Sequence, residues 1–269
     1  MSLPKDTKTI TKANRAAWQE AAPIHQKLNQ ARLEEAFKTP GYSCLKPVET
    51  RILKRLDVAG KDVAQMCCNN GRELLSAKNM GAARCVGFDG AQNFLDQGCA
   101  LAKAANLDVQ FEWCDAYEIP PQFHGTFDIV MITIGVLGWM PDIDGFFASV
   151  AQLLKPGGAL FIHEHHPVTV MVKPGPAEAP VEWELSYFAS APYVDTNGLD
   201  YYGGTRYDAL PNYSYSHKLS DILMGAVKCG LLLEDFEERP DHISNAWWNV
   251  EASDIGLPMS YTLVLRRPL

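Results

Sequence analysis

Residues 63–73 have the sequence Val63-Ala64-Gln65-Met66-Cys67-Cys68-Asn69-Asn70-Gly71-Arg72-Glu73. The apolar pattern of residues 63–66 predicts a buried strand, and the polar residues after it predict a tight loop and the start of a helix. Such a loop points backbone N–H groups at a ligand and lets the chain approach that ligand closely. Loops that bind nucleotide-type cofactors are usually rich in glycine, whereas this loop has one, Gly71. We therefore expect a ligand site of unusual composition.

The overall composition is typical of a folded globular protein. The chain has 269 residues, of which 47% are hydrophobic and 21% are charged. This length suits one large domain, or one domain with a sizeable insertion. The formal net charge is -8 and no run is rich in lysine and arginine, so nucleic acid is disfavoured as a partner.

The targeting and cysteine patterns favour the cytoplasm. No apolar stretch approaches the roughly 20 residues needed to cross a bilayer. The N-terminus lacks the apolar core of a signal peptide. The seven cysteines show no Cys-x-x-Cys spacing, which predicts reduced cysteines and no metal site. We therefore expect a cytoplasmic protein that does not bind membranes, and the sequence leaves its oligomeric state open.

Strand and helix patterns alternate from Asp62 onwards. The helical pattern before the fifth strand is the clearest, because apolar residues recur on one face from Ile143 to Leu154, and the turn Pro156-Gly157-Gly158 closes it. Alternation predicts an α/β, Rossmann-like fold, a doubly wound and mostly parallel sheet with helices on both faces and ligand sites at the carboxyl ends of its strands. Short apolar strands are expected at Val63–Met66, Arg84–Phe88, Val109–Trp113, Phe127–Ile134 and Ala159–His163.

Two regions depart from this alternation. Residues 1–47 are polar and helical in spacing, and we expect them to form an N-terminal cap on the domain of residues 48–269. Residues 167–216, rich in Pro, Gly and Tyr, are too long for a connection and too aromatic for disorder, so we expect an inserted lid over the ligand edge. The strands Leu231–Glu237 and Tyr261–Arg266 follow it. With no helical pattern between them, they are expected to pair antiparallel at the edge of the sheet.

The order of these features resembles the class I S-adenosylmethionine-dependent methyltransferases. The resemblance spans roughly Val48 to Arg267 and rests on an ordered set of motifs rather than on one of them. Residues 65–71 stand where this family has its acidic-x-Gly-x-Gly-x-Gly motif. Asp89 ends the second strand and Asp115 follows the third. The fifth strand is preceded by Leu153-Leu154-Lys155-Pro156-Gly157-Gly158.

The resemblance implies S-adenosylmethionine as cofactor and assigns its contacts. Asp89 would accept hydrogen bonds from both ribose hydroxyls, and Asp115 would face the adenine amino group. For Asp89 the alternative is a cap of the following helix, and for Asp115 it is a turn-forming aspartate. The backbone at Ile134 would lie beside the amino group of the methionine part. The full set of expected cofactor residues is Gln65, Cys67, Asn69, Gly71, Asp89, Gly90, Asp115, Ala116 and Ile134.

The first loop departs from the family pattern. Gln65 stands where an acid is usual, and Cys67 and Asn69 replace two glycines. Asparagine tolerates a left-handed backbone better than other non-glycine residues, so Asn69 can replace a glycine at modest cost. Cys67 is expected to narrow the cavity. We interpret Cys-Asn-Asn-Gly-Arg-Glu as a subfamily variant, and the absence of Gly-x-Gly-x-x-Gly disfavours a dehydrogenase with a dinucleotide cofactor.

The run His163-Glu164-His165-His166 at the end of the fifth strand holds the candidate catalytic residues. A histidine near neutral pKa can take a proton from the nucleophile as the methyl group transfers, and His165 and Glu164 are the selected candidates. The alternative is a set of polar residues bonded to the lid. Strand alternation splits the four side chains between two faces, which disfavours a metal site.

Aromatic residues supply candidates for the substrate pocket. Trp139, after the fourth strand, and Tyr202, in the insertion, are expected to line it, and packing beneath the lid is the alternative reading of both. The sequence thus predicts methyl transfer from S-adenosylmethionine to a small molecule. A protein that binds S-adenosylmethionine or S-adenosylhomocysteine without catalysis is the alternative, motivated by the altered loop.

Overall fold

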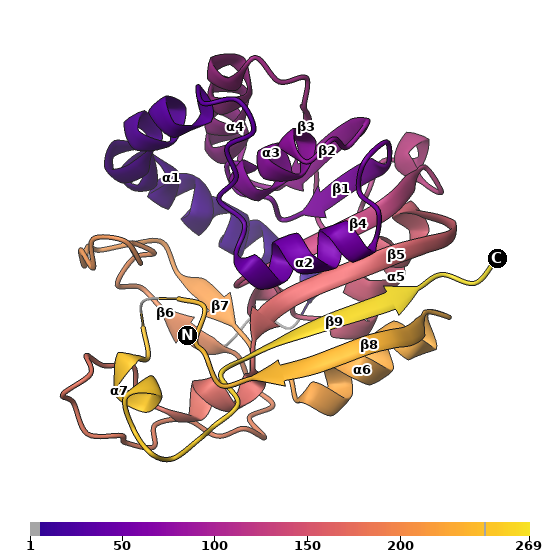
Figure 1. Ribbon diagram of the computed structural model, residues 1–269. Helices are drawn as coiled ribbons and strands as arrows, with labels where there is room; N and C mark the ends of the chain where they lie inside the picture. The colour runs from indigo at the N-terminus through magenta and orange to yellow at the C-terminus, as the bar shows by residue number, and fades with distance from the viewer. Residues whose placement is uncertain (1–5, 245) are drawn as a thin grey trace.

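A seven-stranded mixed sheet forms the centre of the computed structural model, which describes residues 6–244 and 246–269 (Figure 1). The strand order is β3-β2-β1-β4-β5-β9-β8, with β1 to β5 parallel and β9 antiparallel to both of its neighbours. The expected fold class is confirmed, including the antiparallel last strand. The strands are β1 Asp62–Met66, β2 Arg84–Asp89, β3 Gln110–Trp113, β4 Phe127–Thr133, β5 Leu154–His165, β8 Leu232–Arg239 and β9 Ser260–Arg266.

Helices cover both faces of this sheet. Alternate strand residues face opposite sides, so each face carries its own hydrophobic core. Helices α2 and α3 pack with Val63, Met131 and Phe161 on one face. Helices α5 and α6 pack on the other face, with the strand residues that alternate with these. The helices are α1 Thr7–Phe37, α2 Pro47–Arg55, α3 Arg72–Asn79, α4 Gln92–Ala105, α5 Ile143–Leu153, α6 Leu219–Lys228 and α7 Trp248–Glu251, with short 3-10 turns η1 Pro121–Phe123, η2 Leu137–Trp139 and η3 Pro167–Met171.

The long helix α1 packs across α4 at the carboxyl edge of the parallel strands (Figure 1). Its N-terminus is capped by Asp6, whose side chain accepts a hydrogen bond from Thr9 N at 2.8 Å. Ala22 and Leu33 are among its buried residues. None of the described helices is both long and apolar enough to cross a membrane. Residues 1–5 of the expected cap lie outside the described residues.

The insertion at residues 167–216 lies at the same edge as α1. It contains a small antiparallel sheet of β6 (Tyr193–Asp195) and β7 (Asn212–Ser214). Asn14 of α1 exchanges two hydrogen bonds with the backbone of Tyr213, at 2.8 and 2.9 Å. The N–H of Tyr215 donates to the carbonyl of Gly138, after β4, at 2.7 Å. The insertion is therefore tied both to α1 and to the loop that follows β4.

A second long segment, residues 240–257, packs against the start of the insertion. The indole N–H of Trp247 donates to the carbonyl of Val172 at 2.9 Å. Both side chains pack in a small apolar cluster with Val250 and Met259. The two segments lie about 75 residues apart in the sequence. The structure joins them, because each buries apolar side chains that neither could bury alone.

One predicted boundary is wrong. Residues Pro156-Gly157-Gly158 do not form a turn between helix and strand, since α5 ends at Leu153 and β5 begins at Leu154. Leu154 already pairs with Phe127, and a register shift follows before Ala159 pairs with Ile129. The left-handed backbone of Gly157, with φ of 75°, therefore lies at an irregularity within the strand.

Candidate active site

The loop after β1 contains three left-handed residues at alternate positions. Their φ angles are 50° at Cys67, 53° at Asn69 and 64° at Gly71. Asn69 has the conformation expected of a glycine substitute, and its side-chain oxygen accepts a hydrogen bond from Asn70 N at 2.8 Å. The left-handed backbone of Cys67 was not expected, because cysteine carries no sequence signal for it. This loop therefore has left-handed backbone at three positions, as a glycine-rich loop can, although only one of the three is glycine.

The backbone of Gly71 lies close to a side chain of the sheet, whereas close approach to a ligand was expected. A Cβ atom at this position would collide with the ring of Phe111 on β3. Gly71 is also the N-cap of α3, so the missing side chain lets the helix begin directly against the sheet. Its glycine is therefore explained by packing, whereas approach to a ligand was the expectation.

Substitutions of Asn69 should show whether its left-handed backbone or its side-chain amide matters for stability. Asn69→Gly is expected to change the free energy of unfolding by under about 0.5 kcal/mol, because glycine adopts this backbone freely. Asn69→Ala is expected to lower it by about 1–2 kcal/mol, because alanine pays the full left-handed cost. Urea unfolding of both variants measures the difference. Equal stability of the two would contradict a conformational role for Asn69.

Asp89 joins this loop to the start of α4. One carboxylate oxygen accepts a hydrogen bond from Asn69 N at 2.8 Å and the other accepts one from Ala91 N at 2.9 Å. Burial raises the pKa of Asp89 to about 6, because it penalises the charge more than these N–H bonds favour it. The expected alternative, a helix cap, is not what this bond forms, because Ala91 and not Asp89 is the N-cap residue of α4. Each oxygen keeps a second lone pair, so that contact and ribose binding are compatible.

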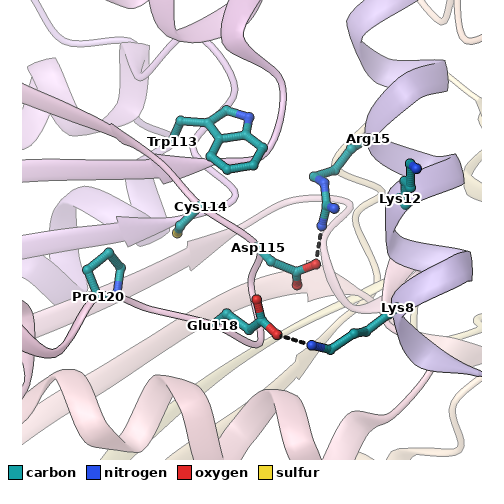
Figure 2. Close-up of a pocket in the computed structure, with 8 residues that line it drawn as sticks. All are labelled: Lys8, Lys12, Arg15, Trp113, Cys114, Asp115, Glu118 and Pro120. Carbon is teal, nitrogen blue, oxygen red and sulfur yellow. Dashed lines mark hydrogen bonds and ion pairs between the residues drawn. The ribbon is translucent and has the colours of Figure 1, made fainter.

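The carboxylate of Asp115 points toward α1 (Figure 2). Its carboxylate forms an ion pair with Arg15 and accepts hydrogen bonds from Thr11 Oγ1 at 2.9 Å and from Tyr117 N at 3.0 Å. The bond to Tyr117 fits the turn-forming alternative. Arg15 and Thr11 carried no signal in the sequence, because their contact with Asp115 joins helix to loop across about 100 residues.

Arg15 also borders an open cavity of about 430 Å³. Its guanidinium lies 5.8 Å from the ring centre of Trp113, and a Cβ atom at Gly90 would collide with its methylene groups. The indole N–H of Trp113 donates to the carbonyl of Gly90 at 2.8 Å, closing this side of the cavity. Figure 2 shows its lining, which is Lys8, Lys12, Arg15, Trp113, Cys114, Asp115, Glu118 and Pro120.

Glu164 holds the loop that follows β4. Its oxygens accept hydrogen bonds from Gly135 N and Val136 N at 2.6 Å each, from His165 N at 2.8 Å and from Leu137 N at 3.2 Å. Its side chain is buried. A general base needs a lone pair directed at the substrate, and four backbone donors already engage this carboxylate. The geometry favours a positioning role for Glu164 over the expected catalytic one.

The histidines of the same strand end have different environments. His163 Nδ1 lies 2.8 Å from Glu49 Oε1, and both side chains are buried. Burial lowers the pKa of His165, so its imidazole is neutral at pH 7. His165 packs edge-on against Trp247, with ring centres 5.3 Å apart. His166 Nδ1 accepts a hydrogen bond from Val168 N at 3.1 Å.

Trp139 and Tyr202 join one aromatic cluster built around α1. Trp18 lies edge-on to Trp139, with ring centres 5.2 Å apart, and His25 lies 5.2 Å from Tyr202. The hydroxyl of Tyr202 accepts a hydrogen bond from Arg72, at the start of α3, at 2.5 Å. The bond with Arg72 brings Tyr202 close to the loop after β1, and Trp139 joins the same cluster through Trp18. In the described part of the chain, no three His, Cys, Asp or Glu side chains are placed to hold a metal ion.

The remaining expected residues line the strand ends. Gln65 is buried, and its amide N–H donates to Thr133 Oγ1 at 2.7 Å. Ile134 N donates to the carbonyl of His163 at 2.9 Å. Ala116 packs against the core beneath α5. Gly135 follows with a left-handed φ of 86°, which a side chain would disfavour.

The sequence from β1 to the start of β5 matches a known family model. Residues 63–158 match the model described as "Methyltransferase domain". The chain contains a class I S-adenosylmethionine-dependent methyltransferase domain. A curated relative, the tRNA U34 carboxymethyltransferase of Campylobacter hominis, is 32% identical over 108 residues, which are 40% of this chain. The chain spans only 37% of that protein's length.

Solved structures share the fold of this methyltransferase domain. An S-adenosylmethionine-dependent methyltransferase from Mesorhizobium loti superposes with a TM-score of 0.60 at 19% identity, over 81% of this chain and 97% of that one. Geranyl diphosphate C-methyltransferase from Streptomyces coelicolor A3(2), with bound S-adenosyl-L-homocysteine, gives 0.57 at 15% identity, over 82% and 78%. At these identities the likeness shows the fold alone.

Proposed function

We propose that this chain binds S-adenosylmethionine at the carboxyl ends of β1, β2 and β4 and transfers its methyl group to a small molecule. The observation that carries the proposal is the contact of Asp89 with Asn69, which joins a half-buried carboxylate to a loop of three left-handed residues. We also propose that the Cys-Asn-Asn-Gly-Arg-Glu loop marks a variant subfamily. Its support is that two non-glycine residues, Cys67 and Asn69, adopt left-handed backbones there.

The residues present fit the cofactor. Asp89 keeps one lone pair on each oxygen for the two ribose hydroxyls. Asp115, with Arg15 beside it, and the backbone of Ala116 would border the adenine ring, next to the cavity of Figure 2. The backbone of Ile134 would face the methionine part. When bound, the cofactor supplies an electrophilic sulfonium methyl group.

The chain itself would align and dry the reacting groups. We propose that residues 1–47 act as a cap and residues 167–216 as a lid, since both lie at the ligand edge and bond to each other through Asn14 and Tyr213. Holding the nucleophile and the methyl group in line lowers the barrier without a covalent bond between the protein and the substrate. Neutral His165 would accept a proton from the nucleophile, and Glu164 would keep the loop after β4 in place.

Seven cysteines without a disulfide fit a reducing cytoplasm.

Transfer of a labelled methyl group tests this function. Wild-type protein and labelled S-adenosylmethionine are incubated with small phenols, amines, thiols and carboxylic acids, and in parallel with tRNA, because the curated relative is named for tRNA. We expect label on a small molecule and none on tRNA, given the net charge of -8. Label on tRNA alone would contradict the acceptor class. Saturable binding without any transfer would favour the non-catalytic alternative.

The same assay tests His165. His165→Ala should reduce turnover while the affinity for S-adenosylhomocysteine, measured by calorimetry, stays unchanged. An unaffected rate would remove His165 from the mechanism.

A further inference from the structure

A buried acid–histidine pair joins α2 to the carboxyl end of β5. Glu49, on α2, places Oε1 2.8 Å from Nδ1 of His163, on β5. The other oxygen of Glu49 accepts a hydrogen bond from Lys46 N at 2.7 Å, in the capping box of α2. Glu49 is 1% exposed and His163 is fully buried. A buried carboxylate is costly unless it is paired, and a capping box alone needs no burial.

Two buried acceptors on this face of the sheet lack partners. Among the described residues, Gln65 Oε1 and His163 Nε2 accept and donate no hydrogen bond. Thr133 lies between them, since it accepts the hydrogen bond from Gln65 at 2.7 Å and pairs in register with His163. Each of the three lies two residues after a residue that packs under α2, so they share that face and form a polar row across β1, β4 and β5.

The chemistry of this row defines its ligand. The carboxylate of Glu49 favours the proton of His163 on Nδ1, which leaves Nε2 as an acceptor. Gln65 Oε1 is also an acceptor, and the negative charge of Glu49 lies directly against His163. Two acceptors near a buried negative charge suit a cationic donor, and an ammonium group has three N–H donors. A neutral hydroxyl would gain less than an ammonium group from attraction to the carboxylate of Glu49.

We propose that Gln65 Oε1 and His163 Nε2 bind the ammonium group of the amino-acid end of the cofactor. Glu49, acting through His163, would supply the negative charge that Gln65 lacks as an amide. This inference rests on the proposed function. It explains how the chain keeps an amide at position 65, where the methyltransferase motif has an acid. The charge is moved from β1 to α2, and it acts through His163 on β5, two strands from β1 in the sheet.

Binding of two related ligands tests the proposal. S-adenosylhomocysteine carries the amino-acid end, whereas 5′-methylthioadenosine lacks it. Glu49→Gln keeps the shape and the capping box but removes the charge. We expect it to weaken S-adenosylhomocysteine at least tenfold and to leave 5′-methylthioadenosine within twofold, by calorimetry. His163→Leu should show the same pattern. Glu237→Gln is the matched control, because its ion pair with Arg51 also reaches α2 but is exposed, and both affinities should stay unchanged.

Charge relocation supplies the decisive variant. Glu49→Gln combined with Gln65→Glu should recover most of the lost affinity for S-adenosylhomocysteine, because the charge returns to the position of the family motif. Equal losses for both ligands in Glu49→Gln would show a structural role and overturn the proposal, as would unchanged binding or a failed recovery. A wild-type protein that binds neither ligand would overturn the proposed function itself, and this inference with it.

Discussion

Glu164→Ala is expected to lower the free energy of unfolding by about 3–5 kcal/mol, the range for removing one partner of a buried charged network. The carboxylate accepts four backbone hydrogen bonds from the loop after β4 and from His165. Alanine would leave these buried N–H groups without an acceptor. Urea or thermal unfolding measures the loss. The cofactor affinity should fall as well, because this loop includes the backbone beside Ile134.

Glu164→Gln separates positioning from proton transfer. Glutamine keeps one oxygen but turns an amide N–H₂ toward backbone donors, so we expect an intermediate loss of stability. Glu178→Ala is the matched control, since Glu178 is exposed on the insertion and its loss should change stability by under about 0.5 kcal/mol. Unchanged stability in Glu164→Gln together with abolished turnover would return Glu164 to the role of general base.

Asp89→Asn is expected to weaken binding of S-adenosylhomocysteine at least tenfold, or about 1.4 kcal/mol. An amide has one acceptor oxygen, whereas two hydroxyls and two backbone N–H groups converge on this position in the proposed complex. Asp128→Asn is the matched control, because Asp128 accepts a hydrogen bond from Asp62 N at the opposite end of the sheet. Equal affinity of Asp89→Asn and wild type would remove Asp89 from the ribose site.

The raised pKa of Asp89 gives this prediction a pH dependence. Only the carboxylate accepts from both hydroxyls, so wild-type affinity should be full above the pKa of about 6 and fall as the pH drops below it. Asp89→Asn should show a flatter profile. For folding the sign is opposite. Because the folded pKa lies above the unfolded value of about 3.9, this group favours folding at low pH, and its contribution is lost as the pH rises through about 6.

Most of the sheet follows from local patterns. The strands ending near Met66 and Asp89 were predicted within about one residue, because a buried parallel strand is a short apolar run between turn signals. The place of Asp89 at the carboxyl end of β2 follows from the same pattern. The left-handed backbone at Asn69 was predictable from its chemistry, whereas that at Cys67 was not.

The partners of the polar residues were not predictable. Arg15 meets Asp115 across 100 residues, and Glu49 meets His163 across 114. Glu164 was selected for its position at a strand end, yet its role depends on a loop about 28 residues away.

The sequence by itself determined the order of strands and helices, the edge at which ligands are expected to bind and the residue types gathered there. Hydrophobic periodicity is a property of neighbouring residues, so a chain carries that information locally. Only the tertiary structure decided which of those polar groups are engaged by backbone donors, as Glu164 is, and which keep an unpaired acceptor, as Gln65 and His163 do. Burial and hydrogen bonding arise between distant segments after packing, and for this reason the loop at residues 67–71 depends on Asp89 of β2 and Phe111 of β3.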